Sequence, residues 1–122
     1  MSDYEKRITT QKAKKFDNGK ADLSLLPESA LKQAAYAFMY GAEKYGRYNY
    51  LNGIEVSRLI AAALRHINSY NEGNEIDPES GAKHLGHAIA NLSMIIELAE
   101  KGKLIDNRYN NMISLDRKSG AV

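Results

Sequence analysis

All three histidines, His66, His84 and His87, lie between positions 66 and 87. His84 and His87 are three apart in a segment with helical periodicity, so their side chains share one face. His66 is near the end of the preceding predicted helix, where an antiparallel neighbour would face the start of the next. Asp77 and Glu79 lie at that start. Imidazoles and carboxylates bind divalent metals, so we expect a metal site at His66, His84, His87 and Glu79.

The same cluster suits general acid–base work on a bound water. We take Asp77, Glu79 and Glu43 as candidate catalytic residues, Glu43 because it lies near the end of the first predicted helix. The spacing leaves a plainer alternative open. His-x-x-His pairs occur by chance on helices, Asp77 can be only a helix cap, and Glu79 can be only a partner of the helix dipole.

A second cluster is cationic and aromatic. Tyrosine faces stack on bases, and lysine or arginine neutralises phosphates. The candidate substrate-binding residues are Lys20, Lys44, Tyr45, Arg47, Asn49, Tyr50, Arg65 and Asn91. The chain has no glycine-rich phosphate loop, so side chains, helix ends or a metal would have to hold a phosphate. These residue types fit a tyrosine-rich dimer interface equally well.

Three segments with helical periodicity must position these residues. The first runs from about Pro27 to Tyr45, and the second from about Glu55 to Tyr70. The third runs from an N-cap at Asp77 to about Lys101. Before them, residues 16–27 are expected to form an ordered loop with apolar anchors at Leu23, Leu25 and Leu26.

The sequence therefore predicts an all-α fold with about three main helices per subunit. Three helices with wide apolar faces close a core poorly, so we expect a bundle completed in a homodimer or higher homo-oligomer. We divide the chain into a flexible arm (1–15), a helical domain (16–102) and a tail (103–122). Leu104, Ile105 and the segment 112–115 are expected to dock part of that tail.

The composition excludes several classes of protein. The absence of cysteine rules out disulfides, thiolate zinc sites and cysteine nucleophiles. A net charge of +2 is too small for general nucleic-acid binding, so no nucleic-acid partner is expected. No apolar run could span a bilayer, and the charged N-terminus lacks the apolar segment of a signal peptide. No membrane partner and a cytoplasmic location are expected.

Several motifs occur in an order that chance would rarely produce. They are Lys15-Phe16-Asp17, Gly41-Ala42-x-Lys44-Tyr45-Gly46, Ser57-Arg58-Leu59, Ala61-Ala62-x-x-Arg65-His66 and Gly73-x-x-x-Asp77-Pro78-Glu79-Ser80-Gly81-x-x-His84-Leu85-x-His87-x-x-x-Asn91. With them, residues 15–100 resemble a family of small phage and prophage proteins named dATP/dGTP diphosphohydrolases. That family looks like a branch of the all-α, MazG-like nucleotide pyrophosphohydrolases.

The resemblance implies metal-dependent hydrolysis of dGTP or dATP to monophosphate and pyrophosphate, with Mg or Mn as cofactor, in a bacterial host cell. The chain departs from the wider superfamily, which carries its metal on Glu-x-x-Glu and Glu-x-x-Asp pairs. Here His84-x-x-His87 stands where Glu-x-x-Asp is expected, and Tyr50 stands where tryptophan is expected. The missing acids motivate an alternative, a non-hydrolytic protein that sequesters a nucleotide signal of host immunity. A third alternative is a purely structural helical dimer.

Overall fold

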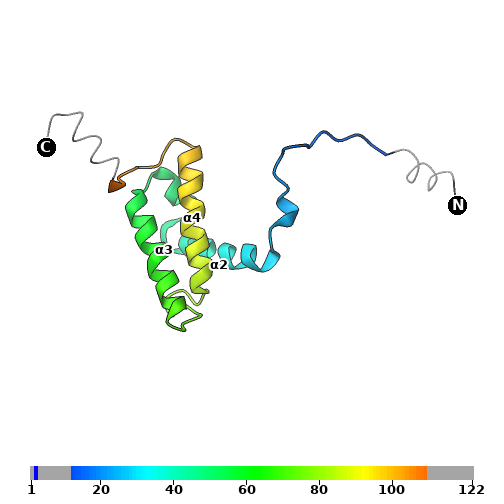
Figure 1. Cartoon of the computed structure of the whole chain (residues 1–122). Coiled ribbons are helices and arrows are strands. Elements are labelled where there is room, and N and C mark those ends of the chain that lie inside the picture. The colour runs from blue at the N-terminus through cyan, green and yellow to red at the C-terminus, as the bar shows by residue number, and fades with distance from the viewer. Residues whose placement is uncertain (1, 3–11, 110–122) are drawn as a thin grey trace, which may run out of the picture.

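The computed structural model describes residue 2 and residues 12–109, and these form an all-α structure with three main helices (Figure 1). The elements are η1 (Leu23–Leu25), α2 (Glu28–Tyr45), η2 (Asn49–Asn52), α3 (Val56–Asn71) and α4 (His84–Glu100). Among the described residues, β pairing is confined to two isolated bridges, Glu55 with Ile105 and Ile76 with Lys83. None of the helices in the described part has the length and hydrophobicity needed to cross a membrane.

The first two predicted helices begin and end where the local chemistry favours it. Pro27 is the N-cap of α2, Glu28 complements the positive helix end, and Gly46 ends the helix with φ of 93°. Helix α3 begins one residue after the predicted start at Glu55 and ends one residue after Tyr70. Both predictions are confirmed to within one residue.

The predicted start of the third helix is wrong. The cap residue Asp77 closes a turn instead, because its carboxylate accepts hydrogen bonds from the Glu79 backbone N–H and the Ser80 hydroxyl. Gly81 has φ of 75°, a conformation that no helix continues through. The Asp77 N–H then bonds to the Ala82 carbonyl, and α4 begins only at His84.

Helices α3 and α4 run antiparallel beside each other, and α2 crosses α4 (Figure 1). Gly86 makes this crossing close. A Cβ at Gly86 would lie 2.8 Å from the backbone carbonyl carbon of Gln33 on α2, so only glycine fits without a shift.

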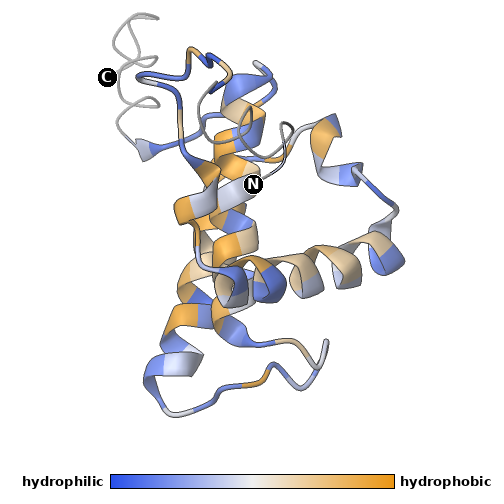
Figure 2. Ribbon diagram, turned by 90° about the vertical axis from the view of Figure 1, so that its right-hand side faces the viewer, coloured by the Kyte–Doolittle hydropathy of each residue, from blue (hydrophilic) through white to orange (hydrophobic). Residues whose placement is uncertain are grey.

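The interior of the described part is small. Its buried apolar residues are mostly alanines, joined by Val56, Leu59 and Leu98. Orange apolar segments recur along α3 and α4 (Figure 2). Many of the large apolar side chains on these helices are nevertheless partly exposed.

The segments flanking the helices differ from each other. Residues 12–27 extend away from α2, and Leu23, Leu25 and Leu26 are exposed, so the prediction that they anchor this segment is wrong (Figure 1). At the other end, Ile105 docks as predicted. Its carbonyl accepts the Val56 N–H at 2.9 Å. The proposed flexibility of residues 1–15 falls mainly outside the described residues, as does the docking of 112–115.

Candidate functional site

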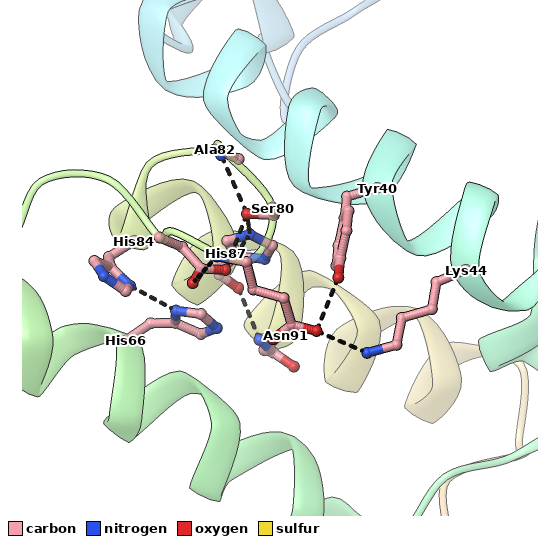
Figure 3. A network of polar contacts seen from close by, with 10 residues as sticks. Tyr40, Lys44, His66, Ser80, Ala82, His84, His87 and Asn91 are labelled. Atoms are coloured by element: carbon pink, nitrogen blue, oxygen red, sulfur yellow. Dashed lines mark hydrogen bonds and ion pairs between the residues drawn. The ribbon is translucent and has the colours of Figure 1, made fainter.

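The three histidines meet where the end of α3 faces the start of α4, as predicted (Figure 3). The Nδ1 atoms of His66 and His84 are 2.9 Å apart, within hydrogen-bond distance. The rings of His66 and His87 stack with centroids 4.5 Å apart and planes 11° from parallel. His84 and His87 are only 6% and 9% exposed. Burial and mutual contact hold the three imidazoles in a fixed arrangement.

The turn before α4 bonds to this cluster through Asp77 and Ser80. The Ser80 hydroxyl donates to Asp77 Oδ2 at 2.9 Å and lies 2.6 Å from His87 Nε2. With the serine proton directed to Asp77, His87 Nε2 is the donor in the second contact. Asp77 Oδ2 is itself 3.4 Å from that nitrogen. The turn that displaced the predicted helix start therefore fixes the orientation of His87.

The surroundings of His66 and His87 favour neutral rings beside an ionised Asp77. Burial lowers the pKa of His66 and of His87 below the usual value, more than Asp77 raises them. Burial raises the pKa of Asp77, but hydrogen bonds from Ser80 and Glu79 and the nearby histidines outweigh it, so that pKa is lowered. Neutral imidazoles are able to accept a proton at pH 7.

Glu79 belongs to a second polar group, which it forms with Tyr40 and Lys44 of α2. Its Oε1 accepts hydrogen bonds from Tyr40 at 2.8 Å and from Lys44 at 3.0 Å. These bonds, Lys44 first, lower the pKa of Glu79, and Glu79 in turn raises the pKa values of Tyr40 and Lys44. The hydrogen bonds from Tyr40 and Lys44 connect α2 to the turn before α4. Because the pKa of Glu79 is lowered, its carboxylate is a weak proton acceptor.

A cavity of about 1500 Å³ lies between α2, η2, α3 and α4 and includes both groups in its wall. Arg58 and Arg65 line it from α3, and Lys44 and Arg47 from the end of α2 and the loop after it. Phe38 and Tyr50, whose ring centroids are 5.9 Å apart, also line it. The cavity thus combines cations, aromatic rings and a histidine–carboxylate network.

The structure brings the candidate site residues together with one exception. Those that line the cavity are Glu43, Lys44, Tyr45, Arg47, Asn49, Tyr50, Arg65, His66, Asp77, Glu79, His84, His87 and Asn91. Lys20 lies in the extended segment before α2 and is not among the lining residues. Two polar partners were not predicted from the sequence: Tyr40, which bonds to Glu79, and Ser80, which lies between Asp77 and His87. The four-residue spacing from Tyr40 to Lys44, which puts both on one face of a helix, is the signal that points to Tyr40.

The histidine set does not fit a metal ion in this arrangement. Within residues 12–109, no three histidine or acidic side chains are placed to hold one ion. His66 and His84 bond to each other instead, and His87 bonds to Ser80. A metal at His66, His84, His87 and Glu79 therefore stays a prediction that would require these side chains to move.

The fold and site define an all-helical domain with a polar, histidine-lined cavity. Residues 10–108 match the family described as dATP/dGTP diphosphohydrolase, N-terminal, and the chain belongs to that family. It is 36% identical over 94 residues to a protein of Salmonella phage PMBT28 named dATP/dGTP diphosphohydrolase. The match covers 77% of this chain and 32% of that relative, so the chain spans about a third of the relative's length. No solved structure matches the chain. The name of this family is that of a nucleotide hydrolase, so the alternative of a non-hydrolytic protein that sequesters a nucleotide is not favoured.

Proposed function

We propose that the cavity binds a purine deoxynucleoside triphosphate and that the chain hydrolyses it to the monophosphate and pyrophosphate. One observation carries the proposal: a cationic, aromatic wall and a histidine–carboxylate network share one cavity in a member of a family named for dATP/dGTP diphosphohydrolases. The volume of about 1500 Å³ exceeds the roughly 300–1000 Å³ of typical small-molecule sites, so a nucleotide has room.

The wall suggests how a nucleotide lies in the cavity. Lys44, Arg47 and Arg65 offset the charge of the triphosphate, and Arg58, on the same face of α3 as Arg65, extends this cationic wall. The base stacks against Tyr50, which already contacts Phe38. The Asn91 amide nitrogen donates to the His87 carbonyl at 2.8 Å, which leaves its oxygen as the atom that can accept from the base edge.

The histidine network supplies the proton chemistry. Water attacks the α-phosphorus, and a new P–O bond forms as its proton passes to a neutral imidazole of the cluster. The bond from the α-phosphorus to the bridging oxygen breaks, and pyrophosphate leaves with that oxygen and the bonding electrons. Asp77 and Ser80 hold His87 in place for this step. Lys44 and the arginines offset the charge that builds on the phosphate oxygens.

We expect turnover to require Mg²⁺ or Mn²⁺, although the histidines of the described part do not form a metal site as they lie. Magnesium usually binds one or two carboxylates together with substrate phosphates. Asp77 and Glu79 would be those carboxylates.

Turnover of a nucleotide panel tests the proposal. The purified chain is incubated with dGTP, dATP, dCTP and dTTP, with Mg²⁺, with Mn²⁺ and with chelator, and the products are separated by chromatography. We expect pyrophosphate and monophosphate mainly from dGTP or dATP, and only with metal. Monophosphate without pyrophosphate, or no product from any triphosphate, would contradict hydrolysis by this chain at the α–β bond.

Variants of the cluster then test the site. His87→Gln and His84→Ala should each lower kcat by about 10²–10⁴-fold, the range for loss of a general acid–base group. Ser93→Ala is the matched control on the same helix, since its hydroxyl bonds only to the Ile89 carbonyl of its own helix. Full activity in both histidine variants would refute the site, and an equal loss in Ser93→Ala would point to a folding defect.

A further inference from the structure

One ion pair in the cavity wall joins α2 to the turn before α4. The Lys44 ammonium donates to Glu79 Oε1 at 3.0 Å, and the Tyr40 hydroxyl donates to the same oxygen at 2.8 Å. Tyr40 and Lys44 lie on successive turns of α2, and their side chains converge (Figure 3). All three residues line the cavity. Glu79 therefore holds the position at Lys44 Nζ that an oxygen of a bound anion would take.

Lys44 differs in this respect from the other cations of the cavity wall. Arg47, Arg58 and Arg65 line the same cavity, and none of the three forms an ion pair with a carboxylate in the part of the chain that the structure describes. An anion can approach these guanidinium groups without displacing a carboxylate. At Lys44 it meets Glu79, and two anions held by one ammonium would lie within about 5 Å of each other, where like charges repel.

The ion pair between Lys44 and Glu79 is weak enough to be exchanged. Their side chains are 43% and 64% exposed, and exposed lysine–glutamate pairs contribute little to stability. A triphosphate carries several negative charges where Glu79 carries one, so it attracts the ammonium more strongly. In a direct competition for Lys44, the triphosphate therefore displaces the carboxylate.

Aromatic side chains keep both partners in place during such an exchange. The Lys44 ammonium lies 5.8 Å from the ring centroid of Tyr40 and 5.2 Å from that of Tyr45, and these contacts do not involve Glu79. The Tyr40 hydroxyl, for its part, bonds to Glu79 without Lys44. The lysine can therefore change partners while it stays at the cavity wall, and the carboxylate stays attached to α2.

We propose that Glu79 competes with phosphate for Lys44. When a triphosphate enters the cavity, Lys44 leaves Glu79 for a phosphate oxygen, and Tyr40 retains the carboxylate. Because the Lys44–Glu79 pair re-forms as the anion leaves, Glu79 weakens binding and favours release. The inference rests on the proposed function in so far as that function places a triphosphate in the cavity, and it does not depend on cleavage.

Calorimetric titration tests the competition. The probes are inorganic tripolyphosphate and the α,β-methylene analogue of dGTP, which has no oxygen bridge to cleave between the α- and β-phosphorus, and chelator is present throughout. Glu79→Gln keeps the size of the side chain and removes its charge. It should lower Kd for both probes by about two- to fivefold, which corresponds to the loss of an exposed ion pair. Lys44→Met should raise Kd for both probes.

Glu43→Gln is the matched control for these titrations. Glu43 is also an exposed carboxylate of the cavity wall, one residue before Lys44, but it forms no ion pair with that lysine. Loss of its charge reports general repulsion of anions and should change Kd less than Glu79→Gln does. Equal tightening in both variants, no tightening in Glu79→Gln, or no binding of either probe to the wild-type chain would overturn the proposal.

A crystal structure of the wild-type chain with the analogue is a second measurement, which needs no substitution. Lys44 Nζ should lie within hydrogen-bond distance of a phosphate oxygen and beyond the roughly 4 Å of an ion pair from Glu79, with Tyr40 still bonded to Glu79. A complex in which Lys44 remains on Glu79 would overturn the proposal.

The turnover panel separates this inference from the proposed function. Exchange of Lys44 in the complex without hydrolysis of any triphosphate would support the competition and contradict the hydrolysis. Hydrolysis together with an unchanged Kd in Glu79→Gln would support the hydrolysis and contradict the competition.

Discussion

The burial of His66 and His87 makes the stability of the fold depend on pH. Burial holds the pKa values of His66 and His87 below the usual value, so the folded chain binds protons at these rings less readily than the unfolded chain does. Protons therefore favour the unfolded state wherever the unfolded histidines titrate, near pH 6.5.

This difference predicts how stability depends on pH. The stabilisation is fully present above about pH 6.5 and is lost as the pH falls through the lowered pKa values of the folded rings. We expect the midpoint of thermal unfolding to fall between pH 7 and pH 5. A double variant, His66→Asn with His87→Gln, should show a flatter profile over this range. Equal midpoints at pH 7 and pH 5 in the wild-type chain would contradict the prediction.

Most of the candidate site could be predicted because its residues are polar types at unusual spacing. His66, His84 and His87 share one helix junction, and that placement follows from periodicity alone. Tyr40 was missed because a tyrosine inside a helix reads as a packing residue. Lys20 was predicted to bind substrate but does not line the cavity. Sequence periodicity does not give the direction in which the segment before α2 leaves that helix.

Among the elements, the turn before α4 shows the limit of local sequence patterns. Asp-Pro-Glu-Ser carries the residue types of a helix start, and the same carboxylate chemistry also closes a turn. The choice depends on Gly81 and on the bond between the Asp77 N–H and the Ala82 carbonyl, a contact that periodicity does not encode. Helix α2 is bounded by Pro27 and Gly46, and neither residue type at these positions also favours a competing turn within the helix, so its bounds were predicted correctly.

The crossing of α2 and α4 predicts opposite effects for two glycine substitutions. Gly86→Ala should destabilise the fold by about 1–3 kcal/mol, because its Cβ would press on the Gln33 backbone. Gly41→Ala, in α2 with nothing within 4 Å of its Cβ, should stabilise by about 0.5–1 kcal/mol through helix propensity. Chemical denaturation of both variants checks this, and equal effects would exclude close helix packing as the reason for Gly86.

At the scale of the whole molecule, the segment after α4 closes the structure by returning to the start of α3. The α3 N-cap residue, Glu55, makes no side-chain capping bond. Asn107 supplies it from a distant part of the chain, since its Oδ1 accepts the Ser57 N–H at 3.0 Å. Its amide nitrogen donates to Glu55 and to the Ser57 hydroxyl. The C-terminal segment therefore contributes to the stability of a cavity wall.

Loss of this distant cap should be measurable. Asn107→Ala should destabilise the chain by about 1 kcal/mol, the usual effect of removing an N-cap. The Ser57 amide should also exchange its hydrogen faster. Asn68→Ala, at an exposed position of α3, is the control and should not destabilise, since alanine favours the helix. Unchanged stability and exchange in Asn107→Ala would show that water caps α3 equally well.

The cavity is built from residues that are close together in the sequence, and this affects the order in which it forms. All the residues that line it come from one uninterrupted stretch, Ala37 to Met94. Its helices α2, α3 and α4 follow one another along the chain. Few segments distant in sequence must therefore meet to form the wall, and folding should be fast. During synthesis from the N-terminus, the whole wall is translated before the segment that carries Asn107. The cavity can therefore begin to assemble on the ribosome before Asn107 is available to cap α3.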